Sequence, residues 1–522
     1  MLGVRVAVEG PLSETVEFFG TAEEAEQVLE CIVGGSVGAD AEHLAERRDI
    51  LWSTDGAFQG LVDLACPGGM SFLVSVGPAA EERSQACPQR QAKYRATRQL
   101  CGLGDGSAAA QSQPPPLARA MPFTDSEAEE VRHDMPLTAG VPDLFPDRPL
   151  AKFAVLFTIH HLSDFLPLIE TAFALGADPG DVTVIDKEYR YLHSGRVDAH
   201  LRQVQEVRVR TYSELEPALR EHFELARERG KKVLVLDDGG YVLPTVLDRV
   251  PEELDSIAGV VEQTMSGIRK LDGQLLSLPL FSVAQSHVKA TVEAYSVADA
   301  AVRNTLALLP QEKFEGRSAL VLGYGRIGEE IAGILRGRRM RVAVYDSDIV
   351  RLVSAHERGF STDRDPTALL ERNKPLLVFG CVGVGSLAAE QFRAIAWDCY
   401  LVSTTSRDRE FALDELAELA TDVEPLGKLG TRYSLANGAR VLVLGHGMPI
   451  NFHYAESLPN RSIDLVLASV LVGACVLARD EPPFPIGIDV EAANEALRDA
   501  GLLDAYYDLW RGETLAGEAV AT

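Results

Sequence analysis

The sequence predicts an α/β protein in which two doubly wound parallel-sheet (Rossmann-like) domains flank a cleft, with a small N-terminal α/β appendage. From Phe153 onward, apolar stretches of strand length alternate with helical stretches, an order that gives a parallel sheet covered by helices on both faces. A second series of this kind begins at Ala319. Its first strand runs into the glycine pattern "GYGRIG", which is typical of a dinucleotide-binding turn.

The N-terminal part differs from the rest of the chain in its sequence pattern and composition. Residues 1–102 alternate short apolar runs with one helical stretch, which predicts a small appendage without a recognisable site. Residues 103–150 are rich in Gly, Ser and Pro and are typical of a linker. Residues 151–295 hold the first alternating series and form the predicted substrate-binding domain.

Residues 296–455 form the second predicted domain, and each glycine of its turn has a physical function. Gly323 permits the tight turn after the strand, and Gly325 lets the backbone approach a pyrophosphate. Gly328 allows the following helix to pack closely on the sheet. The spacing therefore favours a dinucleotide site, although an ordinary strand–helix–strand unit with a glycine turn is the alternative.

The residues that follow the turn indicate which dinucleotide binds. The helix starts at Arg326 and Ile327, so its N-terminus faces the phosphates. Asp346 closes the next strand, where a carboxylate can hold the ribose hydroxyls of an adenosine. Because that carboxylate would repel a 2′-phosphate, the sequence predicts NAD rather than NADP. Residues 456–522 are predicted to be a helical segment that returns to the substrate domain.

Composition excludes several classes of function. The 522 residues carry a net charge of −27, which argues against a nucleic-acid partner because phosphate binding needs clustered Lys and Arg. No run of 18 apolar residues is present, and the N-terminus lacks the features of a signal peptide, so we expect a cytoplasmic protein without a membrane partner. The seven cysteines show no C-x-x-C spacing, so neither a disulfide framework nor a metal site is predicted.

Polar clusters follow several of the predicted strands. Ligands of doubly wound domains bind at the carboxyl ends of the strands, where these clusters should meet. A single cluster can equally be a helix cap or a structural histidine, but several at one cleft favour a functional site. The clusters are His160 and His161 after "FAVLFTI", Asp237 and Asp238 after "KKVLVL", residues 403–408 after "CYLV", and His446 with Asn451 after "RVLVL".

The motifs, taken in order, resemble those of S-adenosylhomocysteine hydrolase over roughly residues 152–475. They are "IHHLSDFLPLIETAFALGA", "VLVLDDGG", "GVVEQTMSG", "VLGYGRIG", "TTSRDREF" and "TRYSLANGARVLVL". The resemblance implies a tightly held NAD that oxidises a ribose 3′-hydroxyl and so acidifies the neighbouring C4′ hydrogen. A base then removes that proton, the 5′ thiol leaves, water adds, and the hydride returns. The oxidation is therefore temporary.

Only part of the family's substrate site is retained. The resemblance places the catalytic histidine on His160, a base with an ordinary pKa near 6.5, and the ribose-contacting aspartate on Asp238. The adenine-side glutamate becomes Asp164, and the threonine before it becomes Leu162. The catalytic glutamate becomes Gln263, which can still bond to a hydroxyl but has lost charge and basicity.

The lysine of the hydride step is the largest loss implied by the resemblance. Its position falls on Thr291, and the acid and amide after it become Glu293 and Ala294. General-base help of this kind is worth about 10² to 10⁴ in rate, and threonine cannot supply it. Lys289 lies two residues earlier, about 200° around a helix, so it substitutes only if the register differs or the backbone is extended.

The resemblance also implies the remaining contacts. Thr264 and Ser266 would donate hydroxyls to the cofactor, and Asn451 would lie under the nicotinamide. The family's cleft histidine becomes Ser406, and Arg407 adds a cation that suits an anionic substrate group. A surface ion pair between that arginine and a neighbouring acid, Asp408 or Glu410, is the alternative.

We therefore expect the cofactor apparatus to persist while the substrate site has been rebuilt. The predicted function is an NAD-dependent enzyme of this superfamily that acts on a different small molecule, as a hydrolase, lyase or dehydratase. A simple NAD-dependent dehydrogenase and a non-catalytic NAD-binding regulatory homologue are the alternatives. The family forms tetramers, but its C-terminal Lys and Tyr tail has no counterpart here, so a homo-oligomer of unknown symmetry is predicted.

Overall fold

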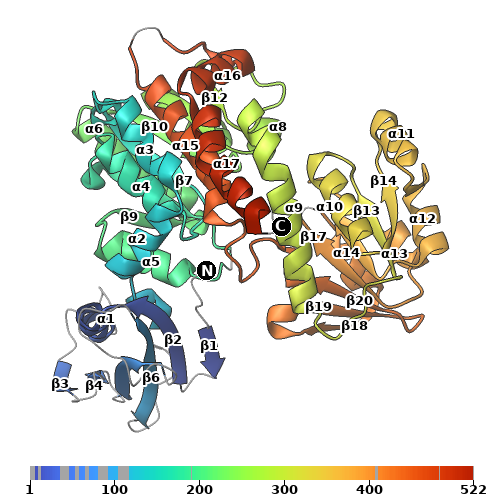
Figure 1. Ribbon diagram of the computed structural model, residues 1–522, viewed down its shortest axis with the longest axis horizontal. Helices are drawn as coiled ribbons and strands as arrows, with labels where there is room; N and C mark the ends of the chain where they lie inside the picture. Colours follow the sequence, from blue (N-terminus) through green and yellow to red (C-terminus); the bar gives the residue numbers. More distant parts are fainter. Residues whose placement is uncertain are drawn as a thin grey trace.

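The structure is a computed structural model, which describes residues 6–9, 13–35, 46–52, 58–64, 70–79, 92–103, 117–189, 191–405, 410–480 and 483–520. It consists of three sheets with their helices (Figure 1). Two of these units are doubly wound and mainly parallel, so the predicted fold class is confirmed.

The N-terminal unit is an antiparallel sheet in the order β1-β2-β6-β5-β4-β3. Helix α1 (Ala22–Gly35) packs against it, because Val28, Leu29 and Ile32 share a buried cluster with residues of β5 and β6. The strands are β1 (Val6–Glu9), β2 (Ser13–Gly20), β3 (Glu46–Trp52), β4 (Phe58–Leu64), β5 (Met70–Pro78) and β6 (Ala92–Leu103).

The segment predicted to be a linker, residues 103–150, contains ordered helices, which corrects that interpretation. Besides the short helix η1 (Leu117–Ala120), α2 (Asp125–His133) and α3 (Pro136–Leu144) occupy its second half. Thr124 and Glu127 form a capping box at the start of α2, and proline begins α3 at a position where no N–H is needed. Both helices place apolar side chains in the core of the next domain. The high Gly, Ser and Pro content of residues 103–150 as a whole masked these local helix-start signals.

The first doubly wound unit has the strand order β21-β12-β11-β10-β7-β8-β9, with every pairing parallel. Alternate residues of its strands enter different cores: Val155 and Phe157 pack with α4 and α15, whereas Ala154 and Leu156 pack with α6 and α7. The strands are β7 (Phe153–Thr158), β8 (Val182–Asp186), β9 (Arg208–Thr211), β10 (Lys232–Asp237), β11 (Ile257–Glu262), β12 (Pro279–Ser282) and β21 (Gly487–Ile488). The helices are α4 (Phe165–Ala174), α5 (Ser194–Gln203), α6 (Leu215–Glu228), α7 (Val242–Arg249) and α8 (Met265–Lys270).

The C-terminal segment completes this unit with α15 (Asn460–Leu477), α16 (Val490–Asp499) and α17 (Leu502–Val520). Among the described residues, α15 alone is long and apolar enough to cross a membrane, but 78% of it is buried inside the fold. A helix that is apolar on all sides is expected at the centre of a large core. Its composition is therefore explained by packing.

The second doubly wound unit has the order β15-β14-β13-β16-β17-β20-β19-β18. Its strands are parallel up to β20, and β18 and β19 add an antiparallel edge. The strands are β13 (Ser318–Leu322), β14 (Arg341–Tyr345), β15 (Ser361–Thr362), β16 (Leu377–Gly380), β17 (Cys399–Ser403), β18 (Ala420–Pro425), β19 (Gly430–Leu435) and β20 (Arg440–Leu444). The helices are α10 (Arg326–Gly337), α11 (Ile349–Glu357), α12 (Pro366–Asn373), α13 (Ala389–Ala394) and α14 (Leu413–Leu419).

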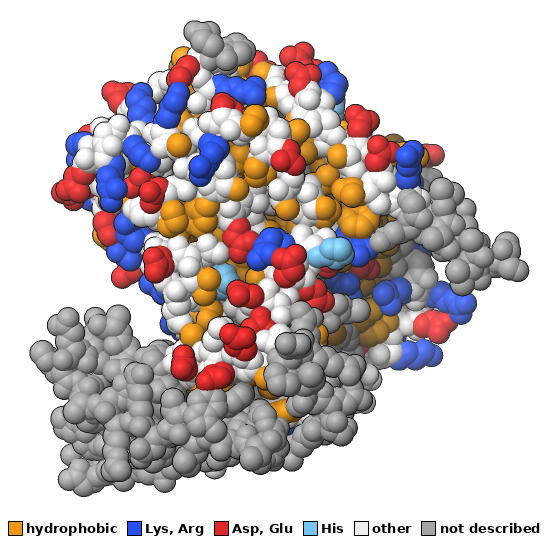
Figure 2. Space-filling model, turned by 60° about the vertical axis from the view of Figure 1, so that its left-hand side comes forward, with side chains coloured by type: hydrophobic (Ala, Val, Ile, Leu, Met, Phe, Trp, Pro, Cys, Tyr) orange, Lys and Arg blue, Asp and Glu red, His pale blue; other side chains and the backbone are white. Residues whose placement is uncertain are grey.

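Helix α9 (His287–Leu308) joins the two doubly wound units and stands between them in Figure 1. Val288, in its first turn, belongs to the core of the first unit, whereas Ala298, Ala301 and Val302 belong to the core of the second. The helix therefore fixes how the carboxyl ends of the two sheets face one another. On the surface shown in Figure 2, acidic and basic side chains are interspersed over the described part, so no large region of one sign appears there.

Candidate functional site

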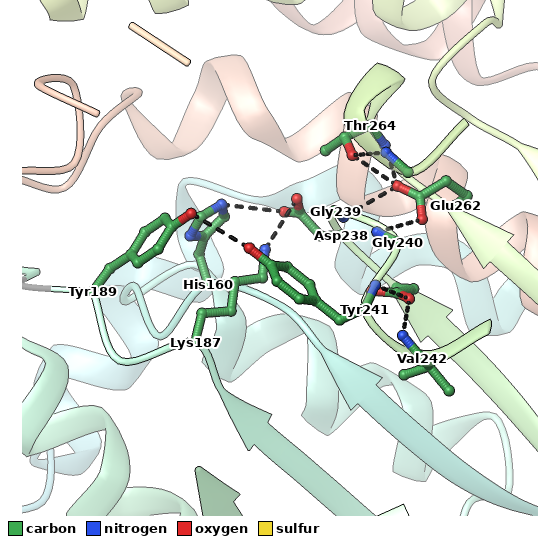
Figure 3. A network of polar contacts seen from close by, with 12 residues as sticks. His160, Lys187, Tyr189, Asp238, Gly239, Gly240, Tyr241, Val242, Glu262 and Thr264 are labelled. Atoms are coloured by element: carbon green, nitrogen blue, oxygen red, sulfur yellow. Dashed lines mark hydrogen bonds and ion pairs between the residues drawn. The ribbon is translucent and has the colours of Figure 1, made fainter. Parts of the chain in front are cut away.

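Three neighbouring strands end in one polar group. In the sheet, β10, β7 and β8 lie side by side, and Asp238, His160 and Lys187 follow their carboxyl ends. His160 Nε2 lies 3.5 Å from Asp238 Oδ2, and Lys187 Nζ lies 3.0 Å from Asp238 Oδ1 (Figure 3). The fold thus brings together the predicted histidine and aspartate and adds a lysine that the sequence analysis missed.

Aromatic rings enclose His160. Its Nδ1 bonds to the hydroxyl of Tyr191, and Tyr189 lies 5.4 Å away between ring centroids. The His160 ring stacks at 4.0 Å on Phe452, which comes from the loop after β20 of the other doubly wound unit. The site therefore lies at the junction of the two units, where ligands of such folds bind.

Burial gives the histidine and the aspartate opposite protonation behaviour. Burial, helped by the charges of Lys187 and Lys289, lowers the pKa of His160 to about 3, although Asp238 opposes the change. Burial alone would raise the pKa of Asp238, but Lys187, His160 and Lys289 together lower it to about 2. His160 is therefore neutral and Asp238 ionised at neutral pH, which corrects the ordinary pKa expected for His160.

His161 occupies a different environment from its neighbour. It is fully buried, stacks on Phe165 at 5.9 Å and lies 3.9 Å from Asp186 Oδ1. Within the described part of the chain, neither of its ring nitrogens has a hydrogen-bond partner. His161 therefore faces the core, whereas His160 faces Asp238.

Helix α9 supplies Lys289 and Glu293 on one face and Thr291 on the other. Lys289 Nζ lies 3.0 Å from Glu293 Oε2, and both side chains are largely buried. Burial raises the pKa of Glu293, against the effect of Lys289. Thr291 is exposed, and its hydroxyl donates to the carbonyl of His287 in its own helix. The prediction that Thr291 binds substrate is therefore wrong, because the helical period turns it away from Lys289.

A second residue that the sequence analysis missed is Glu262, at the end of β11. Its Oε1 accepts from the backbone N–H of Gly239 at 3.1 Å, and its Oε2 accepts from that of Gly240 at 3.0 Å. Burial and the nearby Asp237 raise the pKa of Glu262 to about 8. Thr264, predicted to contact the cofactor, donates its hydroxyl to Glu262 Oε1 at 2.8 Å and caps α8. Glu262 thus holds the glycine turn that presents Asp238.

Several polar atoms at the junction are buried without a hydrogen-bond partner among the described residues. They include the side-chain oxygens Oε1 of Gln263 and Oδ1 of Asn451. The Asn451 amide donates to Ser457 Oγ at 3.0 Å, which leaves Oδ1 as a free acceptor. Asp164 is also buried, and burial together with Glu456 raises its pKa well above the ordinary value. Ser266 is half-buried on α8. Such acceptors fit a ligand that carries hydrogen-bond donors.

The glycine turn of the second unit has the geometry of a dinucleotide cradle. Gly323 has a φ of +93°, which favours glycine, and a Cβ on Gly328 would lie 1.9 Å from the Gly323 carbonyl oxygen. A Cβ on Gly325 would meet only Arg351 Nη1, at 3.6 Å, so that face is open. Helix α10 begins at Arg326 and Ile327 and directs its N-terminus to this opening.

Asp346 stands beside the turn. Its Oδ2 accepts from the backbone N–H of Tyr324 at 2.6 Å, and its Oδ1 accepts from that of Asp348 at 2.8 Å. Arg351 Nη1 approaches Oδ2 at 3.9 Å. The predicted residues thus fit an adenosine diphosphate moiety. Ser406 and Arg407 lie outside the described residues, and Glu410, considered as a surface partner of Arg407, is buried.

Fold and cradle define an NAD-binding α/β protein. Residues 292–457 match the family model described as S-adenosyl-L-homocysteine hydrolase, NAD binding domain. These matches indicate a divergent relative of the adenosylhomocysteinases, and the predicted cofactor, NAD, is confirmed for this domain.

The similar proteins cover different shares of the chain. The adenosylhomocysteinase of Gloeothece citriformis is 27% identical over 317 residues, which are 56% of this chain and 72% of that protein. An uncharacterized protein of Mycobacterium tuberculosis is 27% identical over 363 residues, 64% of this chain and 66% of that protein. The crystal structure of a dipicolinate synthase protein from Bacillus halodurans is 13% identical with a TM-score of 0.38, over 63% of this chain and 100% of its own.

Proposed function

We propose that this protein is an NAD-dependent enzyme that temporarily oxidises a hydroxyl group of a nucleoside-like or related small molecule, so that an elimination or addition can follow. The observation that carries the proposal is the neutral His160 beside the ionised Asp238, at the junction with the NAD-binding unit. A base and a hydroxyl-orienting carboxylate are the two groups that this chemistry requires from the substrate domain.

Each side chain then has a role in proton movement. The ionised Asp238 accepts hydrogen bonds from substrate hydroxyls and orients them. The proposal requires the tautomer in which His160 Nδ1–H donates to the Tyr191 hydroxyl, so that Nε2 is the proton acceptor. The 3.5 Å between Nε2 and Asp238 exceeds a hydrogen bond of ordinary length, so Nε2 is accessible to a carbon acid. Bound NAD supplies the hydride acceptor.

The positions of Lys289 and Glu293 suit this pair to the first proton transfer, in which the substrate hydroxyl loses its proton. As hydride leaves a hydroxyl-bearing carbon, the hydroxyl proton must go to a base, and this pair lies largely buried close enough to Asp238 for their charges to interact. In this proposal Lys289 lies where it can assist that proton transfer, and Glu293 orients it. The lysine that the resemblance assigned to Thr291 is thus replaced from the same helix.

The substrate site supports a reaction other than housekeeping S-adenosylhomocysteine hydrolysis. Gln263 stands where the family has a catalytic glutamate, and Leu162 packs with Tyr189, Tyr191 and Phe452. These rings narrow the space next to His160. A substrate that differs in shape from the family's nucleoside is therefore proposed, processed by a hydrolase, lyase or dehydratase step.

Two measurements test the proposal. Mass spectrometry of the purified and denatured protein should show NAD and a co-purified small molecule. Rapid mixing of that compound with the holoenzyme should give reduced nicotinamide absorbance that rises and then returns. A lasting rise would instead identify a simple dehydrogenase. No change with any ligand that binds would identify a regulatory homologue and overturn the proposal.

A further inference from the structure

Lys187 has a position that ordinary packing does not explain. It follows β8, only 2% of its side chain is exposed, and its Nζ lies 3.0 Å from Asp238 Oδ1. The Tyr241 ring lies beneath it, with the centroid 5.6 Å from Nζ. Lysine is almost never fully buried unless it is paired, because desolvating an ammonium group is costly. The ion pair between Lys187 and Asp238 therefore suggests that this buried lysine has a function in the site.

We propose that Lys187 is a positioning residue, which acts through Asp238 to keep His160 as a neutral proton acceptor. The proposal rests on the proposed function, in which Nε2 of His160 receives a proton from the substrate. Lys187 itself transfers no proton in this scheme. Its role is to neutralise and hold the carboxylate that lies between it and the imidazole (Figure 3).

The arrangement of Asp238 supports this role. Each of its two oxygens faces a different cationic or ionisable partner, with Oδ1 toward Lys187 and Oδ2 toward His160. A buried carboxylate needs a compensating positive charge. Without Lys187, His160 is the ionisable group next to Asp238 Oδ2, and its imidazole would be protonated at a higher pH than in the unaltered protein. A protonated imidazole has no lone pair with which to accept the substrate proton.

The other groups that face His160 do not replace this effect. Tyr189 and Tyr191 come from the same loop as Lys187, and burial raises the pKa of Tyr191 well above its ordinary value, so Tyr191 is uncharged at neutral pH. Lys289 on α9 acts on His160 from the other side, but it is already paired with Glu293. His161 acts from the adjacent position, and burial keeps it neutral by lowering its pKa. Burial first, and then Lys187, lowers the pKa of His160.

Histidine titration by NMR tests the proposal without a substrate. The chain has 11 histidines, so the His160 signal is identified by its loss in His160→Gln. In Lys187→Gln we expect the His160 pKa to rise by at least about 1 unit, a tenfold change in proton affinity, because removing a nearby cation favours the charged imidazole. Lys187→Arg should restore the low value.

Lys270→Gln is the matched control. Lys270 also lies over the Tyr241 ring, at 4.3 Å, but its Nζ donates to the carbonyl of Gly239 at 2.6 Å rather than to Asp238. This substitution removes a lysine charge from the same neighbourhood and should leave the His160 titration unchanged. An equal shift in both variants would show a general field effect and overturn the role assigned to Lys187.

A second comparison applies if Lys187→Gln does not fold. Asp238→Asn and Asp238→Asn/Lys187→Gln lack the buried ion pair, and because Lys187 acts through Asp238 in this proposal, their His160 titrations should coincide. An unchanged His160 pKa in Lys187→Gln, or a difference between the two Asp238→Asn variants, refutes the proposal. That failure is distinct from failure of the proposed function, because transient nicotinamide reduction is measured independently. Once a substrate is known, Lys187→Gln should move the acidic limb of the kcat profile to higher pH, and Lys187→Arg should not.

Discussion

At the scale of single residues, the site is a set of ionisable groups whose neighbours decide their charge. His160 and His161 are adjacent in sequence, yet one faces Asp238 and the other faces the core. We expect His160→Ala to leave NAD binding intact and to lower turnover by at least about 10²-fold, the lower end for loss of a general base. Equilibrium binding and steady-state rates check this result.

For His161→Ala we expect the opposite result, which is a lower stability with normal turnover. Because His161 is fully buried, we expect a loss of stability of about 1–3 kcal/mol from lost packing, with normal turnover in the folded protein. If turnover falls with His161→Ala and not with His160→Ala, the catalytic assignment fails. Asp238→Asn should mainly weaken substrate binding, and a rise in KM with little change in kcat would show it.

We expect the carboxylate of Asp346 and the guanidinium of Arg351 to set the choice between NAD and NADP. Asp346→Ala should weaken NAD binding by about 1–3 kcal/mol, the cost of a lost charge-assisted hydrogen bond. Arg351, 3.9 Å from that carboxylate, would then face the ribose alone, and an arginine there accommodates a 2′-phosphate. NADP affinity should therefore rise in Asp346→Ala and fall back in Asp346→Ala/Arg351→Ala. Titrations of both dinucleotides measure this, and tighter NADP than NAD binding in the unaltered protein would remove the role of Asp346.

At the scale of elements, helix α10 contains a matched pair of glycines. A Cβ on Gly328 would lie 1.9 Å from the Gly323 carbonyl oxygen, whereas nothing lies within 4 Å of one on Gly333. Gly328→Ala should therefore destabilise the NAD-binding unit and abolish NAD binding. Gly333→Ala should stabilise the helix by about 0.5–1 kcal/mol, the usual gain from replacing an exposed helical glycine. Thermal melting and NAD titration of both variants distinguish these outcomes.

Helix α6 carries a buried histidine that makes stability depend on pH. Burial lowers the pKa of His222 to about 3, and its Nδ1 bonds to Thr183 Oγ1 at 2.9 Å. The unfolded chain, with a pKa near 6.5, binds the proton more readily, so stability is complete above about pH 6.5 and falls as the pH drops toward 3. Unfolding at several pH values should show a weaker acid dependence in His222→Gln, by an order of a few kcal/mol at pH 4. An unchanged dependence would exclude His222 as its source.

The elements also show what the sequence can predict. Alternating apolar runs and the glycine turn predicted both parallel sheets, because burial on two faces leaves a strong pattern. The position of His160 and Asp238 directly after predicted strands indicated that they belong to the site. Lys187 follows β8 in the same way, and its position after "VTVID" was the signal that could have revealed it. Thr291 failed because helical register depends on where α9 starts, which local sequence does not settle.

At the scale of the whole molecule, the proposed change of substrate leads to a prediction about the family's own reaction. The protein should hydrolyse S-adenosylhomocysteine poorly or not at all, since Gln263 lacks the basicity of a glutamate and aromatic rings crowd His160. A thiol-release assay checks this. Turnover in the range of 1 to about 10³ s⁻¹ that is common among enzymes would show that Lys289 and the remaining groups are sufficient.

Because α9 contributes Val288 to one core and Ala298 to the other, a cut within this helix does not divide the two doubly wound units into self-sufficient halves. A fragment that ends near residue 295, or one that begins there, would expose an apolar stripe of this helix to water and would aggregate or remain unfolded. The two units should accordingly melt in a single cooperative transition, and bound NAD should raise the melting temperature of both.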